Sequence, residues 1–237
     1  MSRPTLSELR WPMDDESHRQ AVEWAEGIAT QVLEWTWRAF DLLGGSVLSR
    51  VDMTQPLEQL ERDLTGNHFA EIQGVWARET EGETSIEPWP EYAELETRAP
   101  APAKPPAYDI AFVWRANRRI AFPIEAKVVK TPSALADYLG DTDKFVSGIA
   151  APWVGEGAQI AYLLKGDSSV FFTNLKSRLR RRLEPVSDFL HRPHRVSRHK
   201  RTKSPLLHLH HLVMHLNTRD DTASEAEQLQ LTGEGFS

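Results

Sequence analysis

The stretch Tyr108–Val129, YDIAFVWRANRRIAFPIEAKVV, holds two apolar runs on either side of a short polar segment. Tyr108–Trp114 and Ile120–Val129 are rich in β-branched and aromatic residues, which is typical of β-strands. The segment between them, Arg115–Arg119 (RANRR), is short enough for a hairpin connection. The sequence therefore predicts two consecutive strands here and a sheet at the centre of the fold.

Helices are predicted on both sides of this hairpin. Asp14–Leu43 has apolar residues near the 3.6-residue period, contains no proline and is followed by Gly44-Gly45. A second helix is expected after Pro56, with Gly66-Asn67 as a point where it can break. The later helices expected are Ser133–Ser147, with Ser133 as its N-cap, and the basic helix Asn174–Leu183.

Two further strands are expected, at Gln159–Leu164 and Leu206–Leu216, and Val170–Thr173 can either extend the first of them or open the basic helix. Glu79–Ala107 is acidic and rich in proline, which favours an extended surface loop. Arg192–Lys203 is expected to be a basic loop. This order of elements predicts an α/β fold with a central mixed β-sheet flanked by helices.

The composition of the 237-residue chain is that of a globular protein, with 40% hydrophobic and 26% charged residues. There is no cysteine, which excludes disulfides, thiol nucleophiles and cysteine-based zinc sites. No apolar run reaches the roughly 18 residues that a membrane span needs, and Met1–Arg10 lacks the apolar region of a signal peptide. We therefore expect a cytoplasmic protein with no membrane partner.

Charge is unevenly distributed along the chain, whose formal net charge is -6. Lys176–Lys203 contains 11 Lys and Arg residues against two acids, Glu184 and Asp188, and the rest of the chain carries an excess of acids. Such segregation predicts a surface for a polyanion on an otherwise acidic body. A solvated basic helix followed by an exposed loop is the alternative that the sequence leaves open.

Residues 1–50 are expected to form a Trp-rich helical arm. This segment holds half of the eight tryptophans, namely Trp11, Trp24, Trp35 and Trp37. We expect these side chains to form core between the arm and the rest of the fold. The alternative is a contact surface for a partner protein or a second copy of the chain, because tryptophan is enriched in interface hot spots.

Charged residues interrupt the apolar strands at Asp109, Glu125 and Lys127. Residues two apart in a strand point to one face, so Glu125 and Lys127 project together, and hairpin pairing can bring Asp109 beside them. Such charges on an apolar strand pair are costly unless they are used. A Mg²⁺ ion fits two carboxylates, and Lys127 could orient or deprotonate a metal-bound water. The alternative is a structural ion pair on a half-exposed sheet.

This arrangement resembles the PD-(D/E)XK restriction-endonuclease-like superfamily, in which an Asp precedes E-x-K on the next strand and a helix follows. Four segments are similar to those of uncharacterised bacterial members: PIEAKVV, DYLGDTDKFVSG, IAYLLKGD and the S-x-H-x-R pattern of Ser197–Arg201. The position before Asp109 is Tyr108, where the motif has Pro. The match covers Leu57 to Leu216, which implies a nuclease-like domain at 51–216, followed by a polar tail at 217–237 that we expect to be disordered.

The resemblance implies a Mg²⁺- or Mn²⁺-dependent endonuclease with a restriction-endonuclease-like core. It assigns Asp109 and Glu125 as metal ligands, Lys127 as the catalytic lysine and Glu61 as a further acid of the metal site. DNA is favoured over RNA as substrate, in a bacterial defence system that includes a protein partner or a homo-oligomer. The basic segment supplies Arg180, Arg181, Arg182 and Arg198 as nucleic-acid contacts, and Lys144, His199 and Arg201 are further candidates whose alternative is solvated surface.

Seven of the nine histidines lie between His191 and His215. His208 and His210 share a strand face, as a zinc pair does, but neither cysteine nor an acid within that strand completes a ligand set. We therefore favour partner, phosphate or core roles for them. For the whole chain, a metal-dependent nuclease is favoured over a catalytically silent nucleic-acid-binding or regulatory subunit and over a scaffold that binds another protein.

Overall fold

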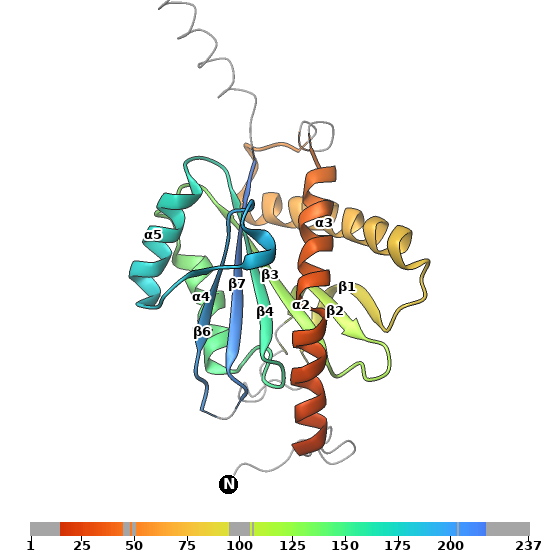
Figure 1. Ribbon diagram of the computed structural model, residues 1–237. Helices are drawn as coiled ribbons and strands as arrows, with labels where there is room; N and C mark the ends of the chain where they lie inside the picture. Colours follow the sequence, from red (N-terminus) through yellow and green to blue (C-terminus); the bar gives the residue numbers. More distant parts are fainter. Residues whose placement is uncertain are drawn as a thin grey trace, which may run out of the picture.

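The computed structural model describes residues 15–44, 48, 51–94, 105, 107–202 and 204–216. Within these residues, seven strands form one mixed sheet in the order β1-β2-β3-β4-β7-β6-β5 (Figure 1). The helices are α2 (Asp15–Leu42), α3 (Leu57–Thr80), α4 (Ala136–Ser147), α5 (Ser168–Leu179) and the short 3-10 helix η2 (Ser187–Phe189). The strands are β1 (Ile86–Ala93), β2 (Ala107–Trp114), β3 (Ala121–Val129), β4 (Glu156–Leu163), β5 (Glu184–Pro185), β6 (His194–His199) and β7 (Leu207–His215). The predicted α/β class, with a mixed sheet flanked by helices, is confirmed.

The predicted hairpin is formed by β2 and β3, which pair antiparallel with Ile110 opposite Ile124 and Val113 opposite Ala121. Strands β3, β4 and β7 are parallel and form the centre of the sheet. All residues of β4 are buried, as expected for a parallel strand covered on both faces. The hairpin therefore connects an antiparallel edge to a buried parallel centre.

Neighbouring residues of β3 separate the two halves of the core. Val128 packs with the apolar residues of α2 and α3, and Val129 packs with those of α4 and α5. The two helix pairs therefore cover opposite faces of the sheet (Figure 1). Trp35 and Trp37 of α2 are 1% and 3% exposed, which confirms the core expectation for them. Trp24 is partly buried and stacks on Trp114, and Trp11 lies outside the described residues.

Helix α3 continues without a break through Gly66 to Thr80, contrary to the expected interruption. A helical glycine costs about 1 kcal/mol relative to alanine. The buried side chains of Phe69, Ile72 and Val75 beyond it offset that cost by packing on the sheet.

Two strands occupy segments that were expected to be loops. Strand β1 contains Pro88 and Pro90, which are tolerated because β1 is the edge of the sheet and does not need every amide for pairing. Strand β6 lies in the expected basic loop 192–203. Its buried residues, His194, Ser197 and His199, are polar and so give no hydrophobic alternation in the sequence.

Two helix starts also differ from expectation. Helix α4 begins at Ala136, its N-cap is Leu135 without a side-chain cap bond, and the Ser133 hydroxyl contacts Thr131 instead. Helix α5 begins at Ser168, so Val170–Thr173 is helical, and the Asp167 side chain accepts a hydrogen bond from the Ser169 amide. The tail 217–237 and most of the proline-rich segment 95–106 lie outside the described residues. No helix in the described parts of the chain is long and apolar enough to cross a membrane.

Candidate active site

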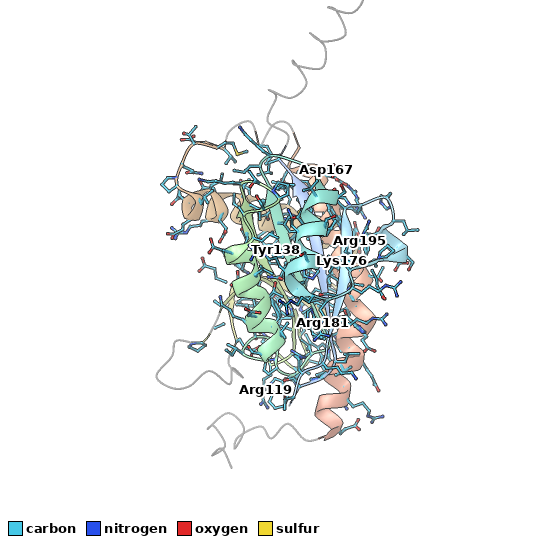
Figure 2. All side chains as sticks on the ribbon, turned by 90° about the vertical axis from the view of Figure 1, so that its left-hand side faces the viewer. Arg119, Tyr138, Asp167, Lys176, Arg181 and Arg195 are labelled. Atoms are coloured by element: carbon cyan, nitrogen blue, oxygen red, sulfur yellow. The ribbon has the colours of Figure 1, made fainter. Side chains whose placement is uncertain are left out.

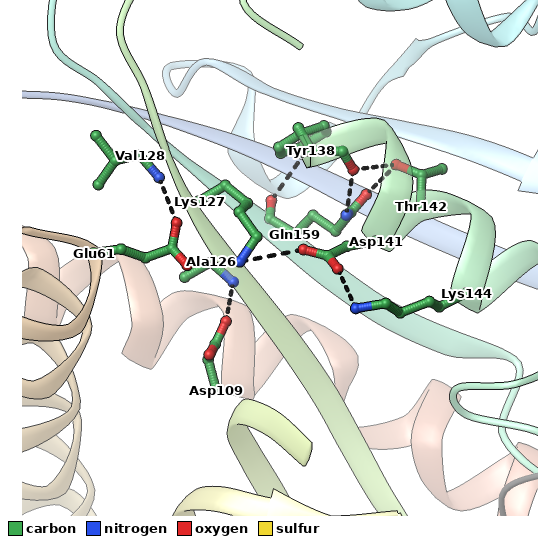
Figure 3. A network of polar contacts seen from close by, with 10 residues as sticks. All are labelled: Glu61, Asp109, Ala126, Lys127, Val128, Tyr138, Asp141, Thr142, Lys144 and Gln159. Atoms are coloured by element: carbon green, nitrogen blue, oxygen red, sulfur yellow. Dashed lines mark hydrogen bonds and ion pairs between the residues drawn. The ribbon is translucent and has the colours of Figure 1, made fainter. Parts of the chain in front are cut away.

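The four charged residues that the sequence assigned to the site lie on three elements that meet between the two helical layers. Asp109 is near the start of β2, Glu125 and Lys127 are in β3, and Glu61 is in the second turn of α3. A fifth residue, Asp141 of α4, approaches from the other face of the sheet (Figure 3). We call Glu61, Asp109, Glu125, Lys127 and Asp141 the acid–lysine cluster.

The cluster lies where the pairing of β2 with β3 ends. The register runs from Val113–Ala121 to Ile110–Ile124 and goes no further. Beyond it, the amides of β3 donate to carboxylates instead of to a strand. The Ala126 amide donates to Asp109 Oδ2 at 2.7 Å, and the Val128 amide donates to Glu61 Oε2 at 3.1 Å (Figure 3). The free edge of β3 thus fixes two of the acids through its backbone.

Lys127 lies between the two helical layers at this opening. Its Nζ donates to Glu61 Oε1 at 2.6 Å and lies 3.4 Å from Asp141 Oδ2. Lys144, one turn further along α4, donates to Asp141 Oδ1 at 2.6 Å. The ammonium of Lys127 is therefore held by carboxylates from α3 and α4.

Burial and repulsion perturb the acids of the cluster. Burial, together with the charges of Asp109 and Asp141, raises the pKa of Glu125 well above its ordinary value. Burial also raises the pKa of Asp109, although the Ala126 amide opposes this shift, and it raises the pKa of Glu61 despite its contact with Lys127. The site therefore concentrates buried carboxylates that lack enough positive charge.

Lys127 responds in the opposite sense. Burial by itself would lower its pKa, but the hydrogen bond with Glu61 and the charges of Asp141, Glu61 and Asp109 outweigh burial and raise the pKa. The side chain therefore stays a protonated ammonium at neutral pH.

A cleft of about 420 Å³ opens beside the cluster between α3 and β1. Its walls include four acids, Glu58, Glu61, Glu91 and Asp109. Glu91 belongs to β1, which pairs with β2, and its φ of 44° is left-handed, which is strained for a residue other than glycine. Glu61 and Asp109 of the cluster thus face a cleft whose lining holds four acids and one base, Arg62, an excess of negative charge that attracts cations.

The residues expected to contact nucleic acid lie in different places in the structure. Arg180, Arg181 and Arg182 line a shallow cleft of about 460 Å³ with Lys176 at the end of α5, away from the acid–lysine cluster. Figure 2 shows Lys176, Arg181 and Arg195 on the side of the molecule formed by α5 and β6. Arg198 is exposed and paired with Glu184, and Lys144 is half exposed at the rim of the cluster.

The other two candidates make internal contacts. The His199 ring is 3% exposed and contacts the Ser197 hydroxyl, and the Arg201 guanidinium donates to the backbone carbonyls of Ala151, Val154 and Pro205. The side chains of His199 and Arg201 therefore lie inside the fold, and neither lines the acidic cleft or the basic cleft. Burial and the nearby charges of Arg181 and Arg201 lower the pKa of His199.

Two histidines of β7, His208 and His210, join a chain of hydrogen bonds on the α2 face of the sheet. Glu156 of β4 contacts His208 Nδ1 at 2.7 Å and His210 Nε2 at 3.0 Å. His210 Nδ1 contacts His194 Nε2 at 3.0 Å, and Trp37 Nε1 donates to the other nitrogen of His194 at 3.4 Å. We call these five residues the histidine chain. The acid that the strand itself lacks comes from the neighbouring strand, which the sequence did not indicate.

Asp141 was also missed by sequence reasoning. The one local signal is its i,i+3 spacing to Lys144, which is common on exposed helix faces and so does not indicate a buried site.

Among the described residues, no group of three or more His, Asp or Glu side chains is preformed as a metal site. A scan against protein-family models, a search of curated proteins and a search of solved structures found no match to this chain. Assignment of the site therefore depends on its own residues and their geometry.

Proposed function

We propose that this protein is a divalent-metal-dependent nuclease of the PD-(D/E)XK type, which hydrolyses phosphodiester bonds of nucleic acid, with DNA favoured over RNA. The observation that carries the proposal is the meeting of Glu61, Asp109, Glu125 and Lys127 beside an acidic cleft. These are the four residues that the resemblance assigns to catalysis and metal binding. Chance clustering of four residues spread over 66 positions of sequence and three elements is a weaker explanation.

The acids of the cluster are of the chemical type that binds Mg²⁺ or Mn²⁺, and their side chains would have to move together to hold such an ion. Carboxylate oxygens are the ligands that these hard cations prefer, and Asp109, Glu125 and Glu61 would supply them. The raised pKa values of these three groups reflect first burial and then the negative charges of neighbouring acids, and a divalent cation would relieve both. When bound, such an ion polarises the scissile phosphate and lowers the pKa of a bound water.

Lys127 would act as a cation rather than as a base. Glu61 and Asp141 hold its side chain as an ammonium, and their charges raise its pKa. Its ammonium can donate a hydrogen bond to the attacking water or to the phosphate, and its charge would stabilise the negative charge that develops there. Of the two roles expected from the sequence, orientation is favoured over deprotonation.

The basic cleft at the end of α5 would contact the phosphate backbone. Four basic side chains line this cleft: Lys176, Arg180, Arg181 and Arg182. Arg182 pairs with the partly exposed Glu184. Phosphate contacts of this kind position a duplex without reading its sequence. His199 and Arg201 are not part of this proposed surface, because their side chains are used inside the fold.

The proposal extends to a cytoplasmic bacterial defence system in which a partner protein or a second copy selects the target. An unrestrained nuclease would damage its host, which supports control by a partner. Trp35 and Trp37 are buried, so they do not supply the contact surface.

A catalytically silent nucleic-acid-binding or regulatory subunit is the second candidate. The observation that favours it is the ion-pair network of Lys127 with Glu61 and Asp141, which compensates the lysine without a metal ion. Such a protein would keep the fold and the basic cleft and bind nucleic acid without cutting it.

One assay separates these candidates. Supercoiled plasmid, linear duplex and single-stranded DNA, together with an RNA of the same sequence, are incubated with the protein in Mg²⁺ or in EDTA. Cleavage in Mg²⁺ alone, absent from the Glu125→Gln variant, supports the nuclease. Binding of the same substrates without cleavage in any metal supports the silent subunit.

A further inference from the structure

Asp141 of α4 is the carboxylate of the acid–lysine cluster to which neither the sequence nor the proposed function gives a role. It is 4% exposed, whereas Asp137 and Asp143 of the same helix are exposed. Burying a carboxylate is costly unless charged or hydrogen-bonding partners compensate it. The partners of Asp141 therefore indicate what it is for.

Both partners of Asp141 are lysines. Oδ1 accepts a hydrogen bond from Lys144 at 2.6 Å. Oδ2 is buried, has no hydrogen bond among the described residues and faces the ammonium of Lys127 at 3.4 Å (Figure 3). The charge of Lys127 is thus what compensates this oxygen.

The turn of α4 that carries Asp141 is fixed by a buried polar network. The Tyr138 hydroxyl contacts His211 Nδ1 at 2.9 Å. The Gln159 side-chain nitrogen Nε2 donates to the backbone carbonyl of Tyr138 at 3.1 Å, and Thr142 Oγ1 donates to Gln159 Oε1 at 2.7 Å (Figure 3). These contacts lock the turn to β4 and β7, as required of a residue that must hold another in place.

Asp141 also has an unfavourable effect that a purely structural residue would avoid. Its charge lies near that of Glu125, another buried carboxylate, and the two repel. An asparagine of the same shape would fill the space without this repulsion. What the charge of Asp141 does, and an asparagine would not do, is attract the Lys127 ammonium and hold it in position.

We propose that Asp141 is a positioning residue of the candidate active site, which holds the Lys127 ammonium on the α4 side. The inference rests on the proposed function. Lys127 is a flexible four-carbon chain with one carboxylate on each side, Glu61 from α3 and Asp141 from α4. Glu61 is also a candidate metal ligand, so Asp141 is the partner that keeps Lys127 in place when Glu61 is engaged elsewhere.

The first test compares Asp141→Asn with Asp143→Asn, a matched change at an exposed acid of the same helix, in the full chain. Misplacement of a catalytic group by about 1 Å can cost on the order of 100-fold, so Asp141→Asn should lower kcat by about 10- to 100-fold. KM for linear duplex DNA and Mg²⁺ affinity, measured by titration calorimetry on the substrate-free protein, should not change. Asp143→Asn should match the wild type. Wild-type kcat in Asp141→Asn overturns the inference, and weakened Mg²⁺ binding makes Asp141 a metal ligand instead.

The second test is a double-mutant cycle in thermal stability, which needs no activity. Asp141→Asn is made in the wild type and in Lys127→Met. In the wild type, Asp141→Asn removes an ion pair with Lys127 and should lower Tm. In Lys127→Met that ion pair is already absent, and Asp141→Asn removes a buried charge that has lost one of its two lysine partners. Its effect on Tm should therefore be more favourable in the Lys127→Met background. Equal effects in both backgrounds show that Asp141 does not act on Lys127. If the wild type cleaves no substrate, the proposed function fails, whereas this cycle still decides whether Asp141 holds Lys127.

Discussion

The acid–lysine cluster and the histidine chain are two buried polar groups in one sheet, and they are compensated in different ways. In the histidine chain, donors run in one direction: Trp37 to His194, His194 to His210, and His210 to the Glu156 carboxylate, which also accepts from His208. One carboxylate thus receives two imidazole donors. In the acid–lysine cluster, three carboxylates with raised pKa values lie close together.

The difference shows how function can be distinguished from structure among buried polar residues. A chain of hydrogen bonds in which the buried nitrogens and the carboxylate oxygens have partners stabilises the fold and needs no external ligand. Crowded carboxylates beside a cleft reduce stability, which is expected where an external cation is to bind. The same substitution should therefore have opposite effects in the two regions.

The largest effect is expected at Lys127. Lys127→Met removes the ammonium that would donate to the reacting group and should lower Mg²⁺-dependent cleavage by about 100-fold or more. Lys130→Met, at an exposed lysine three residues further along the chain, is the control and should cleave like the wild type. Equal rates for wild type and Lys127→Met in a plasmid-nicking assay would remove Lys127 from the mechanism.

Glu→Gln substitutions compare the two regions directly. Glu156→Gln replaces an acceptor oxygen by a donor, which breaks the hydrogen bond with either His208 or His210, and the free energy of unfolding should fall by about 1–3 kcal/mol. Glu125→Gln replaces a carboxyl group whose ionised form is disfavoured by burial and by the charges of Asp109 and Asp141, so at neutral pH without metal it should raise the stability. Urea unfolding measures both, and a loss of stability in both variants would contradict the distinction.

The pH dependence of stability should differ in sign between the regions. Burial raises the folded-state pKa of Glu125. The contribution of this group to the free energy of unfolding is therefore fully present below its unfolded pKa, about 4, and is lost as the pH rises through the folded-state pKa. Burial lowers the folded-state pKa of His194. The contribution of His194 to the free energy of unfolding is therefore fully present above its unfolded pKa, about 6.5, and is lost as the pH falls below that value. The advantage of Glu125→Gln over the wild type should therefore grow with pH. An advantage that is constant from acid to neutral pH would show that Glu125 does not titrate as inferred.

The smallest of these effects concerns binding. Neutralising Arg180, Arg181 and Arg182 should weaken duplex binding and reduce the slope of log affinity against log salt by about 0.9 for each phosphate that the protein no longer neutralises. Fluorescence anisotropy across a salt series measures the slope. A triple variant with the wild-type slope would show that the end of α5 faces away from nucleic acid.

The centre of the fold could be predicted because its signals are local. The strands at Tyr108–Trp114 and Ile120–Val129 are apolar and lie next to each other in sequence, so both the elements and their pairing follow from the sequence. Strand β1 could not be predicted, because Pro88 and Pro90 argue against a strand unless its edge position is known. Strand β6 buries His and Ser, whose environment depends on which strands become its neighbours.

The site divides in the same way. Glu125 and Lys127 are two residues apart in one strand, so the period of the strand is enough to place them together. The contact of Glu61 with Lys127 spans 66 positions of sequence, so strand or helix periodicity could not place the two together. Glu61 was assigned through the resemblance instead. Asp141 could not be assigned, since the burial of one acid of α4 and the exposure of two others depend on how the helix packs.

The most direct test of the acid–lysine cluster as a cation site is thermal unfolding of wild type, Glu125→Gln and Glu156→Gln during titration with Mg²⁺, with Mn²⁺ as a second series. A ligand that binds the folded state alone raises Tm in a saturable way. The wild type and Glu156→Gln should show this rise, whereas Glu125→Gln should start from a higher metal-free Tm than the wild type and respond little. A wild type that does not respond to either ion, or a Glu125→Gln variant that responds as fully as the wild type, would contradict the assignment of this cluster as the metal site.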